Sequence, residues 1–213
     1  MGVIAKARER RLFEHQDLLI RFTLRQIEAQ TKGSWLGMLW VLVNPLLMLA
    51  LFTLVFGMIM GSDFGVLENP GPYDFPLGIF IGLTVMGLIT ETMGQSPMVV
   101  VGHKNLVKKV VFPLHLLPVA TVGSVFFKTL MSSLLAFVFV VFVGPGLTWS
   151  ALWYPLILVP MLLLALGLGW LISALGVYFR DSQQLMGFLG TALFYASAVF
   201  YPTTRVPEPV YDY

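Results

Sequence analysis

Two ionisable side chains, Glu91 and Lys128, interrupt the long apolar stretches of this sequence. Ionisable residues inside a membrane are costly and often functional, so an acid and a base there could line a path for a polar cargo. Glu91 has a second interpretation, because it precedes Pro97 by a short interval and could reach water near a helix end. A pair between Glu91 and Lys128 is geometrically possible, since both lie toward the same side of the membrane. The sequence leaves open whether the pair forms.

The sequence contains no motif for metal-dependent or nucleophilic catalysis. The three histidines, His15, His103 and His115, share no motif, and no H-E-x-x-H pattern is present. A G-x-S-x-G nucleophile elbow is missing, and the chain has no cysteine. An intramembrane enzyme, such as a lipid-modifying transferase, needs more convergent acids and bases than Glu91 and Lys128 supply. We therefore expect no enzymatic activity and no metal site in this chain.

The elements that position these residues follow from composition. Hydrophobic residues make up 57% of the 213 residues and charged residues 11%, less than half the share of about 25% found in soluble domains. Most of the surface must face lipid, where spanning segments of this kind are helical. The sequence predicts an all-α, polytopic membrane helix bundle with five spans, in the apolar stretches Ser34–Met60, Leu77–Val101, Leu116–Val143, Leu152–Phe179 and Leu185–Phe200.

The positive residues predict the orientation. Of the 13 Lys and Arg residues, seven precede the first span, three lie between spans two and three, and Arg180 lies between spans four and five. All eleven fall on one side if the spans alternate, and only Arg205 lies on the other. The positive-inside rule then places the N-terminus in the cytoplasm.

The segment before the first span is predicted to be an amphipathic helix in the membrane interface. Its charged residues recur at intervals of three or four, the spacing of one helix face. We call them the charge stripe: Arg10, Glu14, Asp17, Arg21, Arg25, Glu28 and Lys32. The helix is either a simple anchor or a lever that meets a cytoplasmic partner. The chain thus divides into a cytoplasmic segment, residues 1–33, and a transmembrane domain, residues 34–213.

Aromatic residues offer a further set of candidates. Rings near span ends suit the membrane interface, and rings facing a path would offer apolar faces to sliding sugars. The candidates for such a path, taken together with the two ionisable residues, are Trp35, Trp40, Glu91, Lys128, Tyr195 and Tyr201.

Four stretches in order resemble the ABC-2 type permeases of polysaccharide exporters, which move O-antigen, capsule and teichoic acid. They are Lys32–Trp40 followed by Asn44-Pro45-Leu46, Asn105–Pro113 followed by Leu117-Pro118, Tyr178-Phe179-Arg180-Asp181, and Tyr201-Pro202 with Val206-Pro207-Glu208. The resemblance covers most of the chain, from about Leu18 to Pro209.

The resemblance implies a permease subunit that exports lipid-linked polysaccharide across the bacterial inner membrane. Its partners would be a second copy of itself and a separate ABC ATP-binding subunit, with no nucleic acid involved. This chain has no G-x-x-x-x-G-K-[ST] loop, so ATP and Mg would be held by that partner. By motif, the ATPase-coupling loop would comprise Asn105, Leu106, Lys108, Lys109, Phe112 and Pro113.

Two points stay open at this stage. An ABC-2 permease for a drug or small lipid is the alternative within transport, because no single residue encodes the substrate. Family members usually have six spans, whereas five are visible here, so we expect the sequence to be truncated.

Overall fold

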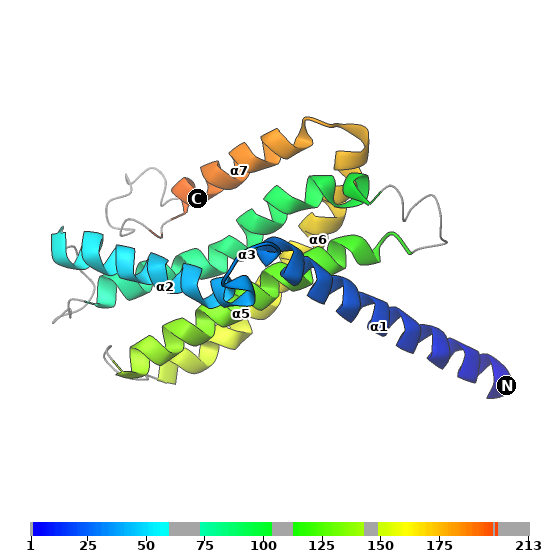
Figure 1. Cartoon of the computed structure of the whole chain (residues 1–213), viewed down its shortest axis with the longest axis horizontal. Coiled ribbons are helices and arrows are strands. Elements are labelled where there is room, and N and C mark those ends of the chain that lie inside the picture. Colours follow the sequence, from blue (N-terminus) through cyan, green and yellow to red (C-terminus); the bar gives the residue numbers. More distant parts are fainter. Residues whose placement is uncertain (1, 60–72, 104–112, 143–148, 198, 200–213) are drawn as a thin grey trace, which may run out of the picture.

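The computed structural model describes residues 2–59, 73–103, 113–142, 149–197 and 199. Every regular element in that part of the chain is a helix, which confirms the all-α prediction (Figure 1). The longest elements are α1 (Gly2–Thr31), α3 (Asp74–Gly102), α5 (Leu116–Phe142) and α6 (Tyr154–Tyr178). Shorter elements precede or extend them: η1 (Gly37–Leu39), α2 (Trp40–Phe52), η2 (Thr53–Ile59), η3 (Trp149–Trp153) and α7 (Ser182–Ala196).

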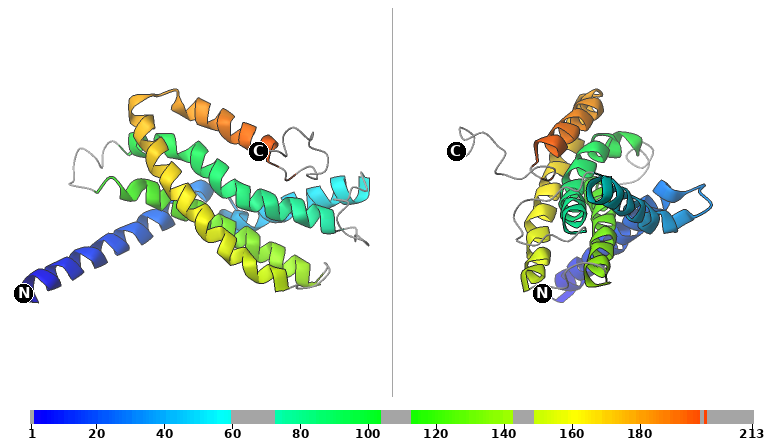
Figure 2. Two further views of the ribbon diagram at one scale, coloured as in Figure 1. Left: turned by 180° about the vertical axis from the view of Figure 1, so that it is seen from behind. Right: turned by 90° about the vertical axis from the view of Figure 1, so that its left-hand side faces the viewer.

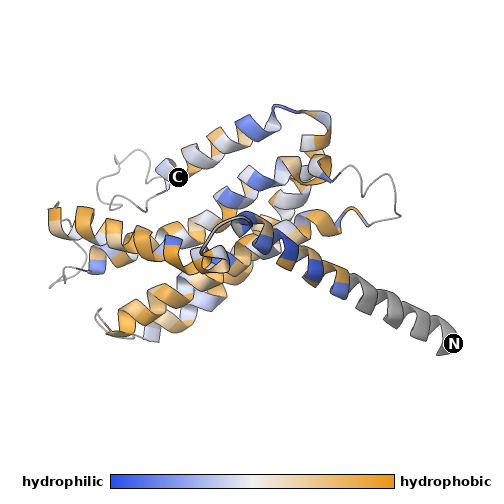
Figure 3. Ribbon diagram, in the orientation of Figure 1, coloured by the Kyte–Doolittle hydropathy of each residue, from blue (hydrophilic) through white to orange (hydrophobic). Residues whose placement is uncertain are grey.

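Four of these segments are long and apolar enough to cross a membrane: Gly37–Ile59, Asp74–Gly102, Leu116–Phe142 and Ala151–Tyr178. They contain 23 to 29 residues each, whereas a span of ~30 Å needs about 20 residues. Hydrophobic residues dominate α2, α5 and α6, while α1 carries hydrophilic stretches (Figure 3). The first four predicted spans are therefore confirmed.

The fifth predicted span, Leu185–Phe200, begins and ends earlier in the structure than the sequence suggested, at Ser182 and Ala196. It corresponds to α7, which has 15 residues, about 22 Å at 1.5 Å per residue. The helix ends because the backbone of Ser197 is extended, with φ −72° and ψ 139°. Within the described residues, the chain thus has four helices of full membrane length and one shorter helix beside them.

The helix α3 is the centre of the bundle, because α2, α5, α6 and α7 all contact it (Figure 2). Its residues Leu88, Ile89 and Met93 form a buried core with side chains of α5 and α6. Glycine permits the closest approach: a Cβ added at Gly176 of α6 would overlap the carbonyl group of Pro97. Small residues at such crossings let membrane helices pack backbone to backbone.

The helix α1 leaves the bundle at its N-terminal end and packs against α5 at its C-terminal end (Figure 1). Ile27 is only 3% exposed in this contact, and Thr23 lies against Gly123 of α5. The predicted helix is confirmed over Gly2–Thr31, while its position in the membrane interface stays a prediction. Of the charge stripe, Asp17, Arg21, Arg25, Glu28 and Lys32 are exposed, and the side chains of Arg10 and Glu14 lie outside the described part.

A glycine turn connects α1 to the first span. Gly33 has a φ of +89° and Gly37 a φ of +48°, values that glycine adopts without steric strain. The indole Nε1 of Trp40 donates a hydrogen bond of 2.6 Å to Ser34 Oγ across this turn. The turn brings the start of α2 back toward the end of α1.

Candidate functional site

A cleft of about 760 Å³ lies between α2, α3 and α5, and we call it the central cleft. Residues from the end of α1 and from α7 complete its wall. Eight of its lining residues are polar or charged: Gln30, Ser34, Asn44, Thr84, Glu91, Lys128, Thr129 and Ser132. The rest are apolar or glycine, and they include the rings of Trp40, Phe52, Phe80 and Phe194.

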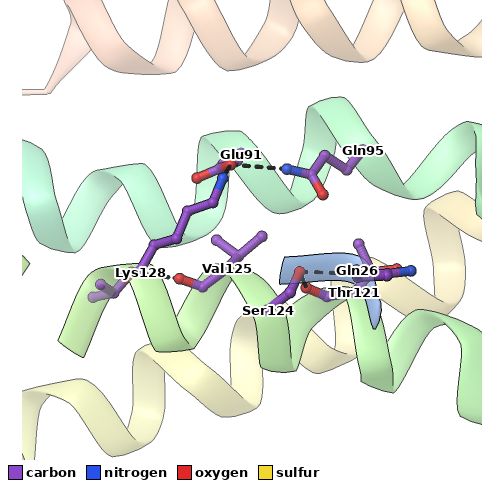
Figure 4. A network of polar contacts seen from close by, with 8 residues as sticks. Gln26, Glu91, Gln95, Thr121, Ser124, Val125 and Lys128 are labelled. Atoms are coloured by element: carbon purple, nitrogen blue, oxygen red, sulfur yellow. Dashed lines mark hydrogen bonds and ion pairs between the residues drawn. The ribbon is translucent and has the colours of Figure 1, made fainter. Parts of the chain in front are cut away.

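Glu91 and Lys128 form an ion pair in this wall (Figure 4). The ammonium of Lys128 donates to Oε1 of Glu91, and the amide Nε2 of Gln95 donates to the same oxygen over 2.8 Å. The Lys128 and Glu91 side chains are 29% and 35% exposed. The question that the sequence left open is therefore answered: the two residues pair.

Both members of the pair lie within one turn of the midpoint of their helices, since α3 covers Asp74–Gly102 and α5 covers Leu116–Phe142. Pro97 does not end α3, which continues to Gly102. Glu91 is thus about 16 Å along the helix from that end, deeper than its proximity to Pro97 suggested. At such a depth an unpaired charge costs about 2.5–3.5 kcal/mol, which gives the ion pair a clear physical reason.

The pair keeps hydrogen-bonding capacity toward the cleft. Among the described residues, Oε2 of Glu91 has no hydrogen-bond partner, and Lys128 uses one of its three N–H donors. The hydroxyls of Thr84 and Thr129 donate to the carbonyls of Phe80 (2.8 Å) and Val125 (3.2 Å). Their oxygens keep acceptor capacity.

A polar contact joins α1 to the α5 face that carries Lys128 (Figure 4). The amide Nε2 of Gln26 donates to Thr121 Oγ1 at 3.0 Å. The hydroxyl of Ser124 is shared between the Thr121 carbonyl at 2.8 Å and Gln26 Oε1 at 3.3 Å. Ser124 precedes Lys128 by one helical turn. We call the two hydrogen bonds of Gln26 the α1–α5 tether.

Sequence reasoning missed Gln26, although a signal was present. At 100° per residue, Gln26 lies well away from the charge stripe, next to Ile27 on the side expected to be apolar. An amide on such a face needs a polar partner when it is buried. That requirement pointed to a contact with another helix.

Three of the six predicted path residues, Trp40, Glu91 and Lys128, line the central cleft. Trp35 is fully exposed and does not line the cleft. Tyr195 of α7 is 67% exposed, and it is its neighbour Phe194 that faces the cleft.

The remaining predicted site residues are placed as follows. Pro113 is half-buried just before α5. Five predicted residues of the coupling loop and one of the path lie outside the described residues: Asn105, Leu106, Lys108, Lys109, Phe112 and Tyr201.

Within the described part of the chain, no group of three His, Cys, Asp or Glu side chains is close enough to hold a metal ion. The ring Nδ1 of His103 lies 2.8 Å from the carbonyl oxygen of Val99. The backbone carbonyl of His115 accepts a hydrogen bond of 3.1 Å from Trp170 Nε1.

A helical bundle with four membrane-length helices and a charged pair near the middle of two of them defines a multi-pass membrane protein with a partly polar cleft. The family model described as "ABC-2 type transporter" matches residues 18–212. The chain therefore belongs to the ABC-2 type transporter family.

Relatives of the chain carry a more specific name. The chain is 28% identical over 199 residues to the "O-antigen export system permease protein RfbA" of Myxococcus xanthus, covering 93% of this chain and 74% of that protein. Two proteins of the same name from Klebsiella pneumoniae are 26% and 25% identical over 195 residues, covering 90% of this chain and 71% of each relative.

Proposed function

We propose that this chain is the permease subunit of an ATP-driven exporter that moves lipid-linked polysaccharide across the bacterial inner membrane. The observation that carries the proposal is the central cleft, in which a charged pair and four other polar residues, Asn44, Thr84, Thr129 and Ser132, lie on membrane-length helices. Polar and charged groups within the bilayer are costly when they contact only lipid. Their presence is explained if a polar cargo crosses between the helices and forms hydrogen bonds with them.

The polysaccharide cargo is supported by the relatives, which are named as O-antigen export permeases. It is also supported by the mixed lining, since the partly exposed rings of Trp40, Phe52 and Phe194 offer apolar faces beside hydrogen-bonding groups. A permease for a drug or small lipid would have less use for the polar half of this wall.

In the proposed assembly, two copies of the chain associate with ABC ATP-binding subunits that hold ATP and Mg. The N-terminus and the basic loop at 104–112 face the cytoplasm, where positive residues concentrate. ATP-driven closure of the partner pushes this loop and α1. The α1–α5 tether then passes the displacement of α1 to the helix that carries Lys128.

The direct test is complementation of a strain that lacks its own permease with this chain and its neighbouring ATPase. Surface polysaccharide and the cytoplasmic lipid-linked pool are measured together. We expect surface polysaccharide to return while the inner pool falls. A folded complex that hydrolyses ATP but leaves the inner pool unchanged would contradict the polysaccharide proposal and favour a small lipophilic cargo.

The coupling loop has its own test. The double variant K108Q/K109Q removes two positive charges from the loop, and we expect it to lower both export and permease-dependent ATPase activity severalfold. The matched control is Q183E/Q184E, which changes the net charge equally at two exposed residues of α7. Equal effects of both variants would show that net charge, and not the loop, is responsible.

A further inference from the structure

We propose that the central cleft is a glycan-binding subsite, in which the Glu91–Lys128 pair forms hydrogen bonds with sugar hydroxyls and aromatic rings support the sugar rings. This inference rests on the proposed function and adds the residues that contact the cargo. It also predicts which part of a lipid-linked glycan binds here, namely the sugars and not the phosphate of the lipid carrier.

The hydrogen-bonding pattern of the pair is the first argument. Glu91 Oε1 already accepts from Lys128 and Gln95, whereas Oε2 accepts from none of the described residues. Lys128 has two further N–H donors. A sugar hydroxyl both donates and accepts, so neighbouring hydroxyls on one ring can bond to Oε2 and to the ammonium together.

The charge of the pair is the second argument. Glu91 and Lys128 neutralise each other, so the site as a whole offers no net positive charge. A phosphate would meet the carboxylate of Glu91 at close range, and like charges repel strongly where water is scarce. Among the described residues that line the cleft there is no second Lys and no Arg to compensate. The site therefore favours a neutral, hydroxyl-rich ligand.

The rest of the wall is the third argument. Asn44 and Ser132 line the cleft without a hydrogen-bond partner among the described residues, which leaves them available to further hydroxyls. The partly exposed rings of Trp40 and Phe194 also line it, and their ring faces suit the C–H faces of sugars. A volume of about 760 Å³ is within the range of specific ligand pockets and gives room for a short run of sugar units.

The absence of cysteine from the sequence permits a direct test of occupancy. In the full chain with its ATPase, S132C places the only thiol of this chain in the cleft, and Q184C places one on the exposed start of α7. A water-soluble methanethiosulfonate reagent is added while a hydrolysis-deficient ATPase holds the transporter with lipid-linked glycan bound. We expect the glycan to block labelling at S132C and to leave Q184C unchanged.

A second arm distinguishes the sugar from the carrier. The lipid carrier phosphate without glycan should leave S132C reactive, and equal protection by carrier and glycan would overturn the proposal. The variant E91Q/K128M removes both charges and leaves no unpaired one. In the S132C background we expect it to raise the glycan concentration needed for half-protection by about tenfold, the effect of losing hydrogen bonds to charged groups. An unchanged concentration would show that the pair has only a structural role.

The outcomes also separate this inference from the proposed function. If the unsubstituted chain restores export and glycan gives no protection at S132C, the subsite is refuted and the export function stands. If the unsubstituted chain leaves the lipid-linked glycan pool unchanged, the proposed function is refuted and the subsite falls with it.

Discussion

Replacing Lys128 with methionine removes the partner of Glu91 and leaves a carboxylate near the midpoint of α3. Methionine is unbranched and apolar, so it fills the space of the lysine stem without a charge. The lysine also has no other hydrogen-bond partner among the described residues. The variant K128M therefore isolates the loss of the ion pair.

The magnitude follows from burial. Removing one partner of a fully buried pair costs about 3–5 kcal/mol. The two side chains here are 29% and 35% exposed, and Gln95 still donates to Glu91 in the variant. We therefore expect a loss of about 2 kcal/mol, somewhat below the cost of a lone charge at a helix centre. For a chain of this size, that loss corresponds to a fall of about 4–8 °C in Tm.

The assay is thermal unfolding of the purified chain in detergent, followed by tryptophan fluorescence. The matched control is the double variant E91Q/K128M, in which the new glutamine side chain on α3 keeps a carbonyl acceptor for Gln95 and no charge remains. We expect this variant to recover most of the lost Tm, because a neutral polar pair costs less than one unpaired charge. A K128M Tm within about 1 °C of the wild type, or a double variant less stable than K128M, would refute the reasoning.

Two further predictions concern helix contacts. The variant G176A places a methyl group against the carbonyl of Pro97 and should destabilise the α3–α6 contact by about 1–3 kcal/mol. The control G167A, where a Cβ meets nothing within 4 Å, should leave the Tm in the same fluorescence assay nearly unchanged. Equal Tm values for the two variants would refute the close approach of α6 to α3. The variant Q26L removes both hydrogen bonds of the α1–α5 tether, each contributing about 1 kcal/mol, and should reduce export and permease-dependent ATPase activity. The control Q16L, at an exposed position of α1, should reduce neither. A Q26L exporter of normal activity would show that the tether transmits no force.

Composition and charge distribution predicted most of the architecture. A span of uncharged residues has one stable conformation in lipid, so four of the five apolar stretches could be assigned from sequence. The end of α7 could not be assigned in this way, because it depends on the extended backbone of Ser197. Apolar residues continue beyond that point in the sequence and give no sign of the break.

The candidate site was harder to predict, for a physical reason. Sequence periodicity gives the position of Glu91 and Lys128 along their helices, but not the rotation of α3 relative to α5. That rotation is set by packing among many side chains, including the buried core of Leu88, Val122 and Ile172. Pairing of Glu91 with Lys128 therefore stayed open until the helices were placed together.

The contributions of single polar residues depend on the same packing. Asn44, Thr84 and Ser132 are inconspicuous in a sequence of apolar spans, and they form a common wall only when three helices converge. Gln26 is an amide outside the charge stripe, but Gln16 and Gln30 share this feature, so the sequence alone does not single it out. Residues that act through contacts between helices are thus the least visible from sequence.

The central claim is that this chain moves a lipid-linked polysaccharide outward at the expense of ATP. The most direct measurement uses inside-out membrane vesicles that contain the chain and its ATPase, supplied with labelled lipid-linked polysaccharide on their outer face. The account predicts that glycan becomes protected from an added glycosidase only when ATP is present, and that K108Q/K109Q reduces this protection. Protection that does not depend on ATP, or ATP hydrolysis without any protected glycan, would contradict the account.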